Sequence, residues 1–297
     1  MTTHYYKIAG HVLSVCFADG LDAASLLPSF SPFQCESEGA VLLEMEVCQG
    51  VAPSFCEWEE IGQFDCGGAN HGVYNHKNGS YAFEISLPDC DGGSLSCCLI
   101  APADFSHCQA VLVGASQSEQ QFGLNNAIMM AYAFAAATQD TLLMHASVIR
   151  HAGYGYLFTA PSGTGKSTHT HLWYKYIPGC DLMNDDNPVV RIVDDETRIF
   201  GSPWSGKTPC YRNIWAPVGA ITRIEQKPEN TIRRMAHVEA FATLLPAVSS
   251  MKWDRRVYNG ICETLSKLLM TTPIFWLGCR PDEEAARVCY EAVKVVQ

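Results

Sequence analysis

Nine consecutive residues in the second half of the chain have the types and spacing of a phosphate-binding loop. The Walker A consensus is G-x-x-x-x-G-K-[ST], and the run follows it except that alanine replaces the first glycine; its members are Ala160, Pro161, Ser162, Gly163, Thr164, Gly165, Lys166, Ser167 and Thr168. The two inner glycines let successive backbone N–H groups face phosphate oxygens, a path that a Cβ would obstruct. We expect Lys166 to reach the β- and γ-phosphates and Ser167 to bind Mg²⁺. The run therefore predicts a site for a nucleoside triphosphate, with ATP and Mg²⁺ as the expected cofactors.

A pair of carboxylates follows at a position that suits a neighbouring strand. Asp185 and Asp186 come directly after Asn184, at the end of an apolar stretch beyond the loop. A nucleotide site needs a carboxylate near its metal, usually at the end of an adjacent strand. One aspartate can hold Mg²⁺, directly or through water, while the other accepts a proton from an attacking hydroxyl. The alternative interpretation is a solvated acidic turn before Asn187 and Pro188.

Two further features could serve the same site. His145 stands in an otherwise apolar stretch, where an imidazole costs desolvation unless it has a partner; a hydrogen-bonded core histidine is the alternative. A glycine-bounded loop at residues 201–207 carries Trp204 and Lys207, and Arg212 follows it. This candidate acceptor loop could close over the nucleotide or its acceptor, with Lys207 or Arg212 meeting phosphate charge. An ordinary surface turn is the other interpretation.

The elements around the phosphate loop are those that the motif requires. An apolar strand at residues 156–159 precedes it and a helix at 167–176 follows it, so the helix N-terminus faces the bound anion. A strand at 142–149 carries His145, another strand enters Asp185, and segments 189–193 and 198–200 form a hairpin. The C-terminal third is expected to be mostly helical, with one more strand near 273–278 and a last helix after Pro281.

The first part of the chain predicts a different organisation. Short stretches at residues 5–17, 40–47, 81–87, 95–100 and 110–114 are punctuated by Gly, Pro, Asp and Asn, as is typical of strands joined by turns. Apolar residues at helical spacing follow at 124–135. We therefore expect a small β-rich N-terminal domain at residues 1–118, a buried linking helix at 119–141, and a P-loop catalytic domain with a helical C-terminal part at 142–297. The fold class is α/β, with mixed α+β character.

Composition limits the partners. Hydrophobic residues make up 47% of the 297 and charged residues 17%, and the formal net charge of −11 argues against a protein that coats nucleic acid. The longest apolar run, residues 127–137, is shorter than the roughly 20 residues that span a bilayer. The N-terminus lacks the pattern of an export signal, so we expect the 14 cysteines to be reduced thiols in a cytoplasmic protein. We expect no nucleic-acid and no membrane partner, and a homo-oligomer is left open.

Four segments taken together resemble the catalytic domain of HPr kinase/phosphorylase, and still more the shorter HPr-kinase-like proteins. The segments are His145-Ala146-Ser147-Val148, the loop from Ser162 to Thr168, Asp185-Asp186 and Gly201-Ser202-Pro203-Trp204. That fold is similar to the nucleotide core of phosphoenolpyruvate carboxykinase. The resemblance implies that Asp185 is the general base for a serine hydroxyl, that Asp186 lies near the metal, and that His145 supports the reacting centre.

The sequence as a whole favours an ATP- and Mg²⁺-dependent phosphotransferase, an HPr-kinase-like kinase that phosphorylates a hydroxyl group. The acceptor would be a serine of a protein or peptide, or a small molecule. The alternative is a nucleotide-binding sensor or scaffold of the same fold without turnover. Because the lysine and both carboxylates are intact, we favour the enzyme. The sequence lacks the Leu-Ser-Gly-Gly-Gln of transporter ATPases and the Asn-Lys-x-Asp of GTPases, which disfavours those P-loop classes.

Overall fold

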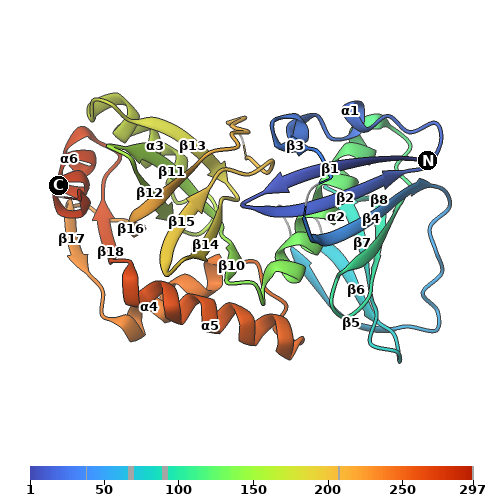
Figure 1. Ribbon diagram of the computed structural model, residues 1–297. Coiled ribbons are helices and arrows are strands. Elements are labelled where there is room, and N and C mark those ends of the chain that lie inside the picture. The colour runs from blue at the N-terminus through green and yellow to red at the C-terminus, as the bar shows by residue number, and fades with distance from the viewer. Residues whose placement is uncertain (38, 66–69, 89–92, 207, 296–297) are drawn as a thin grey trace. The chain divides into compact units, whose positions relative to one another are not determined.

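The computed structural model describes residues 1–37, 39–65, 70–88, 93–206 and 208–295. The chain divides into two compact units, Met1–Ala135 and Ala136–Gln297 (Figure 1). Each unit contains its own large sheet, and helices accompany both sheets. The mixed α/β class expected from the sequence is therefore confirmed.

In the described part of the first unit, nine strands form one sheet in the order β3-β1-β2-β4-β9-β8-β7-β6-β5. Buried and exposed residues alternate along β4, as in a strand with one packed face. The helix α2 packs on this sheet, because Phe134 contacts the rings of Phe83 and Phe105. The elements are β1 Thr2–Ile8, β2 His11–Phe17, α1 Ala23–Leu26, the 3-10 helix η1 Pro28–Phe33, β3 Gln34–Cys35, β4 Val41–Gln49, β5 Glu59–Asp65, β6 Asn70–Asn75, β7 Tyr81–Leu87, β8 Ser94–Ala101, β9 His107–Leu112 and α2 Gln117–Ala136.

Turns decide where the expected strands of this unit begin and end. The stretch expected as one strand at residues 5–17 belongs to a hairpin of β1 and β2, because the chain reverses at Ala9 and Gly10, whose φ angles are +50° and +83°. A turn at residues 77–80, which contains Asn78 and Gly79, joins β6 and β7, and the Gly79 N–H donates to the His76 carbonyl at 2.8 Å. The sequence did not predict β3, β5 or β6 as separate strands.

The second unit is built on a sheet whose main path runs β10-β14-β15-β16-β12-β11-β13, with β18 paired to β16 and β17 paired to β18. Its strands are β10 Thr141–Leu143, β11 Ala146–His151, β12 Tyr154–Thr159, β13 Asp181–Asp186, β14 Val189–Val193, β15 Glu196–Phe200, β16 Trp215–Gln226, β17 Thr231–Arg234 and β18 Ile274–Cys279. Its helices are α3 Lys166–Tyr176, α4 His237–Leu244, the 3-10 helix η2 Leu245–Ala247, α5 Arg255–Thr271 and α6 Glu283–Val293. The hairpin expected at residues 189–200 is confirmed as β14 and β15.

The strand β16 corrects the expectation of a mostly helical C-terminal third. It pairs in parallel with β12, its first residues pair with β15, and its later residues pair with β18, so the sheet forks along this strand. Pro217 and Gly219 interrupt its strand-like pattern, which hid it at the sequence level. Gly219 is required there, because a Cβ would lie 2.7 Å from the ring of Tyr156. The structure thus has a strand of 12 residues beside the strand that leads into the phosphate loop.

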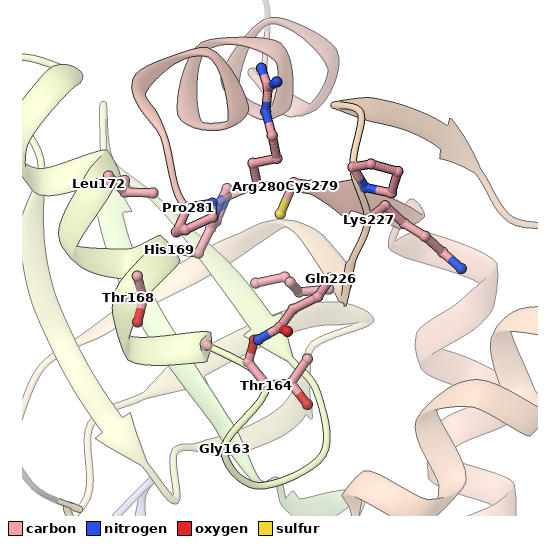
Figure 2. Close-up of a pocket in the computed structure, with 13 residues that line it drawn as sticks. Gly163, Thr164, Thr168, His169, Leu172, Gln226, Lys227, Cys279, Arg280 and Pro281 are labelled. Carbon is pink, nitrogen blue, oxygen red and sulfur yellow. The ribbon is translucent and has the colours of Figure 1, made fainter.

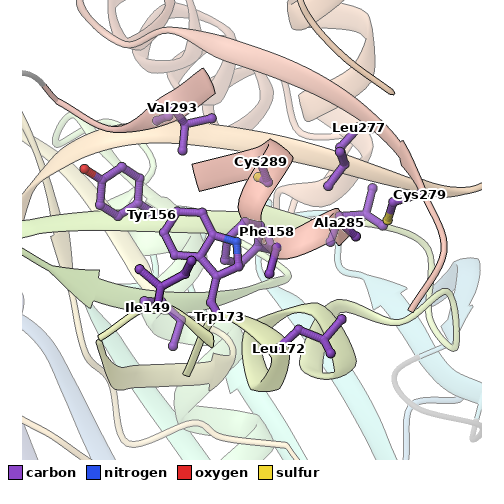
Figure 3. Close-up of a cluster of buried hydrophobic side chains, with 14 of the residues drawn as sticks. Ile149, Tyr156, Phe158, Leu172, Trp173, Leu277, Cys279, Ala285, Cys289 and Val293 are labelled. Atoms are coloured by element: carbon purple, nitrogen blue, oxygen red, sulfur yellow. The ribbon is translucent and has the colours of Figure 1, made fainter. Parts of the chain in front are cut away.

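A cluster of buried side chains holds α3 and α6 against this sheet (Figure 3). Trp173 of α3 lies at its centre, with ring centroids 5.3 Å from Tyr156 and 5.2 Å from Phe158 of β12. Cys289 and Val293 of α6 belong to the same cluster. Burying one large side chain of this kind contributes about 2–3 kcal/mol. Because α3 is anchored through its middle to β12, its N-terminus stays at the end of that strand.

Candidate functional site

Strand register brings the ends of three strands to one edge of the second sheet. β11 is antiparallel to both β12 and β13, and its first residue, Ala146, pairs with Thr159 at the end of β12 and with Asp186 at the end of β13. The phosphate loop leaves β12 at this edge. His145 precedes β11 at the same edge, so the histidine, the loop and the two aspartates come together.

His145 lies in a break between two strands rather than inside one. The strand expected at residues 142–149 is divided into β10 and β11, and Met144 and His145 stand between them. The His145 N–H donates to the carbonyl of Ala247 at 2.7 Å, and the Met144 N–H donates to the carbonyl of Pro188 at 3.1 Å. These two hydrogen bonds pair the backbone N–H groups of Met144 and His145 at the point where strand pairing is interrupted. The break leaves the imidazole 40% exposed instead of buried in the sheet.

The phosphate loop has the backbone that its glycines predict. Gly163 has a φ of +76° and Gly165 a φ of +114°, values that residues with a Cβ rarely adopt. Gly165 is the N-cap of α3, and the helix starts at Lys166. The unpaired N–H groups of the first helical turn therefore open toward the loop, where they can meet an anion.

Lys166, His145 and Asp186 form a chain of polar contacts. The Lys166 ammonium lies 2.7 Å from His145 Nε2 and 3.1 Å from the Ala160 carbonyl. Because an ammonium can only donate, Nε2 is the acceptor, and the neutral imidazole then carries its proton on Nδ1. Nδ1 lies 3.1 Å from Asp186 Oδ1 and can donate to it. Burial lowers the pKa of Lys166, which is 9% exposed, while the charges of Asp186 and Asp185 act in the opposite direction.

Asp185 contacts the phosphate loop directly. The Ser167 hydroxyl donates to Asp185 Oδ1 at 2.9 Å. Asp185 is 5% exposed, and its backbone carbonyl accepts from the Gly206 N–H at 2.5 Å and from the Ser205 hydroxyl at 3.0 Å. A hydroxyl and a carboxylate oxygen, which are both hard ligands, thus stand side by side next to the start of α3.

Asp186 adopts a backbone conformation that favours glycine. Its φ is +140°, a region that costs about 1–3 kcal/mol for a residue with a Cβ. Its carboxylate is held at both oxygens, since Asn187 Nδ2 donates to Oδ2 at 2.9 Å and His145 lies at Oδ1. Strain of this kind persists where several surrounding contacts fix the conformation of a residue, and it is concentrated at functional sites.

The candidate acceptor loop differs from its expected form. Trp204 is 2% exposed, so its indole is packed inside the unit and presents no surface to a ligand. Asn184 Nδ2 donates to the Trp204 carbonyl at 3.2 Å, which ties the loop to β13. Lys207 lies outside the described residues. The loop therefore holds the end of β13 in place through hydrogen bonds to Asn184 and Asp185, and Trp204 does not form the expected contact surface.

Arg212 is likewise engaged away from the phosphate loop. Its Nη1 donates to Asp181 Oδ2 at 2.7 Å and to the Leu182 carbonyl, and Arg150 binds the same carboxylate at 2.9 Å. The pKa of Asp181 is lowered by hydrogen bonds from both arginines, although its burial acts in the opposite direction. Asp181 begins β13 and Asp186 ends it, a separation of roughly 16 Å in an extended strand. In this structure Arg212 is bound to Asp181, and its contact with phosphate charge stays a prediction.

Two pockets border the phosphate loop, and no residue lines both. The first, here called the α3 pocket, has a volume of about 590 Å³ and lies beside residues 163–165 and the first turns of α3 (Figure 2). In Figure 2, Gln226 lies next to Thr164, Pro281 lies near His169 of α3, and Lys227 lies on the side opposite α3; Cys279 and Arg280 also line the pocket. Gln226 Nε2 donates to the Thr164 carbonyl at 3.1 Å. These strand-end residues were not predicted from the sequence.

The second pocket, here called the α4 pocket, has a volume of about 630 Å³ and lies at the other end of the loop. Ala160, Pro161 and Ser162 border it, together with His145, and its other walls come from β16, β17, β18, α4 and η2. Arg223 of β16 is one of the pocket residues that sequence reasoning missed. A cation at an inward position of an otherwise apolar strand was the available signal, but β16 itself was not predicted.

Comparison with solved structures finds a distant likeness. No protein-family model matches the chain, and no curated protein matches it. A solved structure, the HPr(Ser) kinase/phosphatase from Coxiella burnetii, is similar to it at 10% sequence identity with a TM-score of 0.31, over 50% of this chain and 95% of that chain. In the described part of the chain, no helix is both long and apolar enough to cross a membrane.

Proposed function

We propose that this chain is an ATP- and Mg²⁺-dependent kinase that transfers the γ-phosphoryl group to a hydroxyl. One observation carries the proposal: Ser167 of the phosphate loop is bonded to Asp185, and Lys166 of the same loop is connected through His145 to Asp186. Phosphoryl transfer needs a phosphate cradle, a metal site and a proton acceptor in one place. The residues that we assign to these three roles lie at one edge of the sheet.

The α3 pocket suits the base and ribose of the nucleotide. It is lined by Gly163 and Gly165, the glycines that would cradle the phosphates, and by Thr168 of α3, and its volume of about 590 Å³ is within the range of small-molecule sites. A triphosphate that enters from this pocket runs along the loop. Its γ-phosphate would then lie toward Lys166 and His145, where the proton acceptor stands.

The residues fit a magnesium ion held jointly with a nucleotide. Mg²⁺ is usually bound by one or two protein oxygens together with phosphate oxygens and water. Ser167 and Asp185 supply two adjacent oxygens, and no cluster of three or more His, Cys, Asp or Glu side chains within the described residues forms a self-sufficient metal site. We assign Ser167 and Asp185 to hold the ion, which would neutralise charge on the β- and γ-phosphates.

The geometry favours Asp186 as the proton acceptor. Its Oδ1 lies beside His145, at the end of the loop where the γ-phosphate would stand. The acceptor hydroxyl gives its proton to this carboxylate, its oxygen forms a bond to the γ-phosphorus, and the bond to the β–γ bridging oxygen breaks to release ADP. The Lys166 ammonium would lie beside the β–γ bridging oxygen and neutralise the negative charge that forms on this oxygen as ADP leaves. This assignment exchanges the two aspartate roles that the family resemblance implied.

Calorimetry with Mg·ATP tests the nucleotide site. We expect the parent protein to bind, and Lys166→Ala to weaken binding about 10- to 100-fold, since a hydrogen bond to a charged group contributes about 1.5–3 kcal/mol. Lys175→Ala is the matched control, because Lys175 is exposed on the same helix. Binding that is equal in the parent and in Lys166→Ala would contradict the proposal. Binding without any ADP formation would instead support the sensor alternative.

A further inference from the structure

The α4 pocket borders the phosphate loop and is not used by the proposed position of the nucleotide. It has a volume of about 630 Å³, and it meets the phosphate loop at the end where the γ-phosphate would lie. Met235, Ala242, Pro246 and Trp276 give it apolar walls. The volume is in the range of sites for small molecules, which are mostly apolar with a few placed polar groups.

Most charges around this pocket are already neutralised. Arg233 is bound to Glu239 through both of its terminal nitrogens, at 2.8 and 2.5 Å. Glu225 accepts from Trp276 Nε1 at 2.9 Å and pairs with Lys227 at 2.6 Å. In each of these pairs the positive and the negative charge cancel, so neither pair offers a free charge to a ligand.

Arg223 is the exception. Among the described residues its guanidinium has no hydrogen bond and no ion pair, although it is partly buried in the pocket. Burial lowers its pKa, which reflects the cost of holding a charge there, and Glu225 opposes this only through space. A guanidinium has five donors in a rigid fork that matches a carboxylate or phosphate. An unpaired, partly desolvated arginine in a pocket is therefore a recognition group for an anion.

The register places this arginine beside the reacting groups. Arg223 pairs with Thr159, the last residue before the phosphate loop, and neighbouring strands lie about 4.8 Å apart. His145, which contacts Lys166 and approaches Asp186, lines the same pocket. An anion held by Arg223 would thus keep the rest of its molecule within reach of the proton acceptor.

We propose that the α4 pocket is the acceptor site and that the acceptor is a small hydroxy compound carrying a carboxylate or phosphate group, which Arg223 binds. The inference rests on the proposed kinase function. The hydroxyl loses its proton to Asp186 as its oxygen bonds to the γ-phosphorus, and ADP leaves with the electrons of the broken bond. The products are ADP and a phosphate monoester that keeps its original anionic group.

Three probes on one carbon skeleton test the inference: glycerol, glycerate and glycerol 3-phosphate. Binding of each to the full-length protein is measured by calorimetry in the presence of saturating Mg·ADP, and labelled ATP then reports transfer. We expect glycerate or glycerol 3-phosphate to bind and glycerol not to bind, and the better of the two identifies the anion. Arg223→Gln should weaken that binding at least 10-fold, and Arg223→Lys should restore part of it. Arg234→Gln is the control, because Arg234 is exposed on β17, directly follows the pocket residue Arg233 and does not line the pocket itself.

Each outcome decides between named alternatives. If neither anionic probe binds, or if Arg223→Gln leaves binding unchanged, the anionic acceptor site is overturned. If Arg223→Gln weakens Mg·ATP but not Mg·ADP, the arginine serves the γ-phosphate and the acceptor role is also overturned. A protein that binds an anion through Arg223 but does not bind Mg·ATP would keep the anion site and remove the kinase, so the two failures are distinguishable.

Discussion

Replacing each of the two aspartates by asparagine separates metal binding from proton transfer. Asp185 is bonded to Ser167, whereas Asp186 is bonded to Asn187 and lies beside His145. Asparagine keeps the size and one accepting oxygen at both positions, and the negative charge is lost. The contact of Asp185 with Ser167 can therefore survive, whereas Asp186→Asn can keep only one of its contacts with His145 and Asn187. We expect Asp185→Asn to raise the Mg²⁺ requirement and Asp186→Asn to lower turnover at unchanged Mg·ATP affinity.

The magnitudes follow from the two roles. Unit charges about 4 Å apart interact by about 4 kcal/mol at an effective dielectric constant near 20. If water replaces half of that interaction at Asp185, the remaining 2 kcal/mol corresponds to about a 30-fold higher Mg²⁺ requirement. Loss of a positioned proton acceptor at Asp186 costs about 10²–10⁴-fold in rate. The two variants should therefore differ in the property that changes, the Mg²⁺ requirement or the rate, as well as in the size of the change.

The assay is ADP formation over a Mg²⁺ titration, with Mg·ATP affinity measured by calorimetry on the same samples. Asp195→Asn is the matched control, since Asp195 is exposed in the turn between β14 and β15 and its φ of +62° suits asparagine. A raised Mg²⁺ requirement in Asp186→Asn together with lost turnover in Asp185→Asn would refute our assignment and restore the one implied by the family resemblance. Parent-like behaviour of both variants would mean that the aspartates form only an acidic turn.

Two other expectations concern the loop and its helix. Gly165→Ala should lower the free energy of unfolding by about 1–3 kcal/mol and weaken Mg·ATP binding, because its φ of +114° strains any residue with a Cβ; denaturant unfolding and calorimetry measure the two effects, and an unchanged stability would contradict the backbone argument. His169 is 2% exposed, and burial lowers its pKa to about 4. Because the folded state resists protonation, its contribution to stability is complete above about pH 6.5 and should fall by about 1.4 kcal/mol per pH unit between there and pH 4. His169→Gln should flatten this part of the stability profile, and an equal slope in both proteins would show that other groups cause it.

The sequence by itself determined the features that depend on neighbours along the chain. The strand, glycine turn and helix around Lys166 follow from a motif of nine residues whose conformation is local. The hairpin of β14 and β15 was also predictable, because Asp194 and Asp195 can take the positive φ angles that its two-residue turn needs. The residue types of the candidate site were visible for the same reason, since the lysine and serine are adjacent and the paired aspartates follow them at a short distance.

Only the tertiary structure decided which of these groups meet. The pairing of Ala146 with both Thr159 and Asp186 sets the site, and it depends on register between strands that are far apart in the sequence. The break that frees His145 is held by the carbonyl of Ala247, a contact that no local pattern encodes. The same is true of Arg223, which faces the loop because β16 inserts beside β12. Conformational propensity depends on a few neighbouring residues, whereas strand pairing and burial depend on the whole unit. For that reason the sequence indicated the residue types of the candidate site but not how those residues are arranged in space.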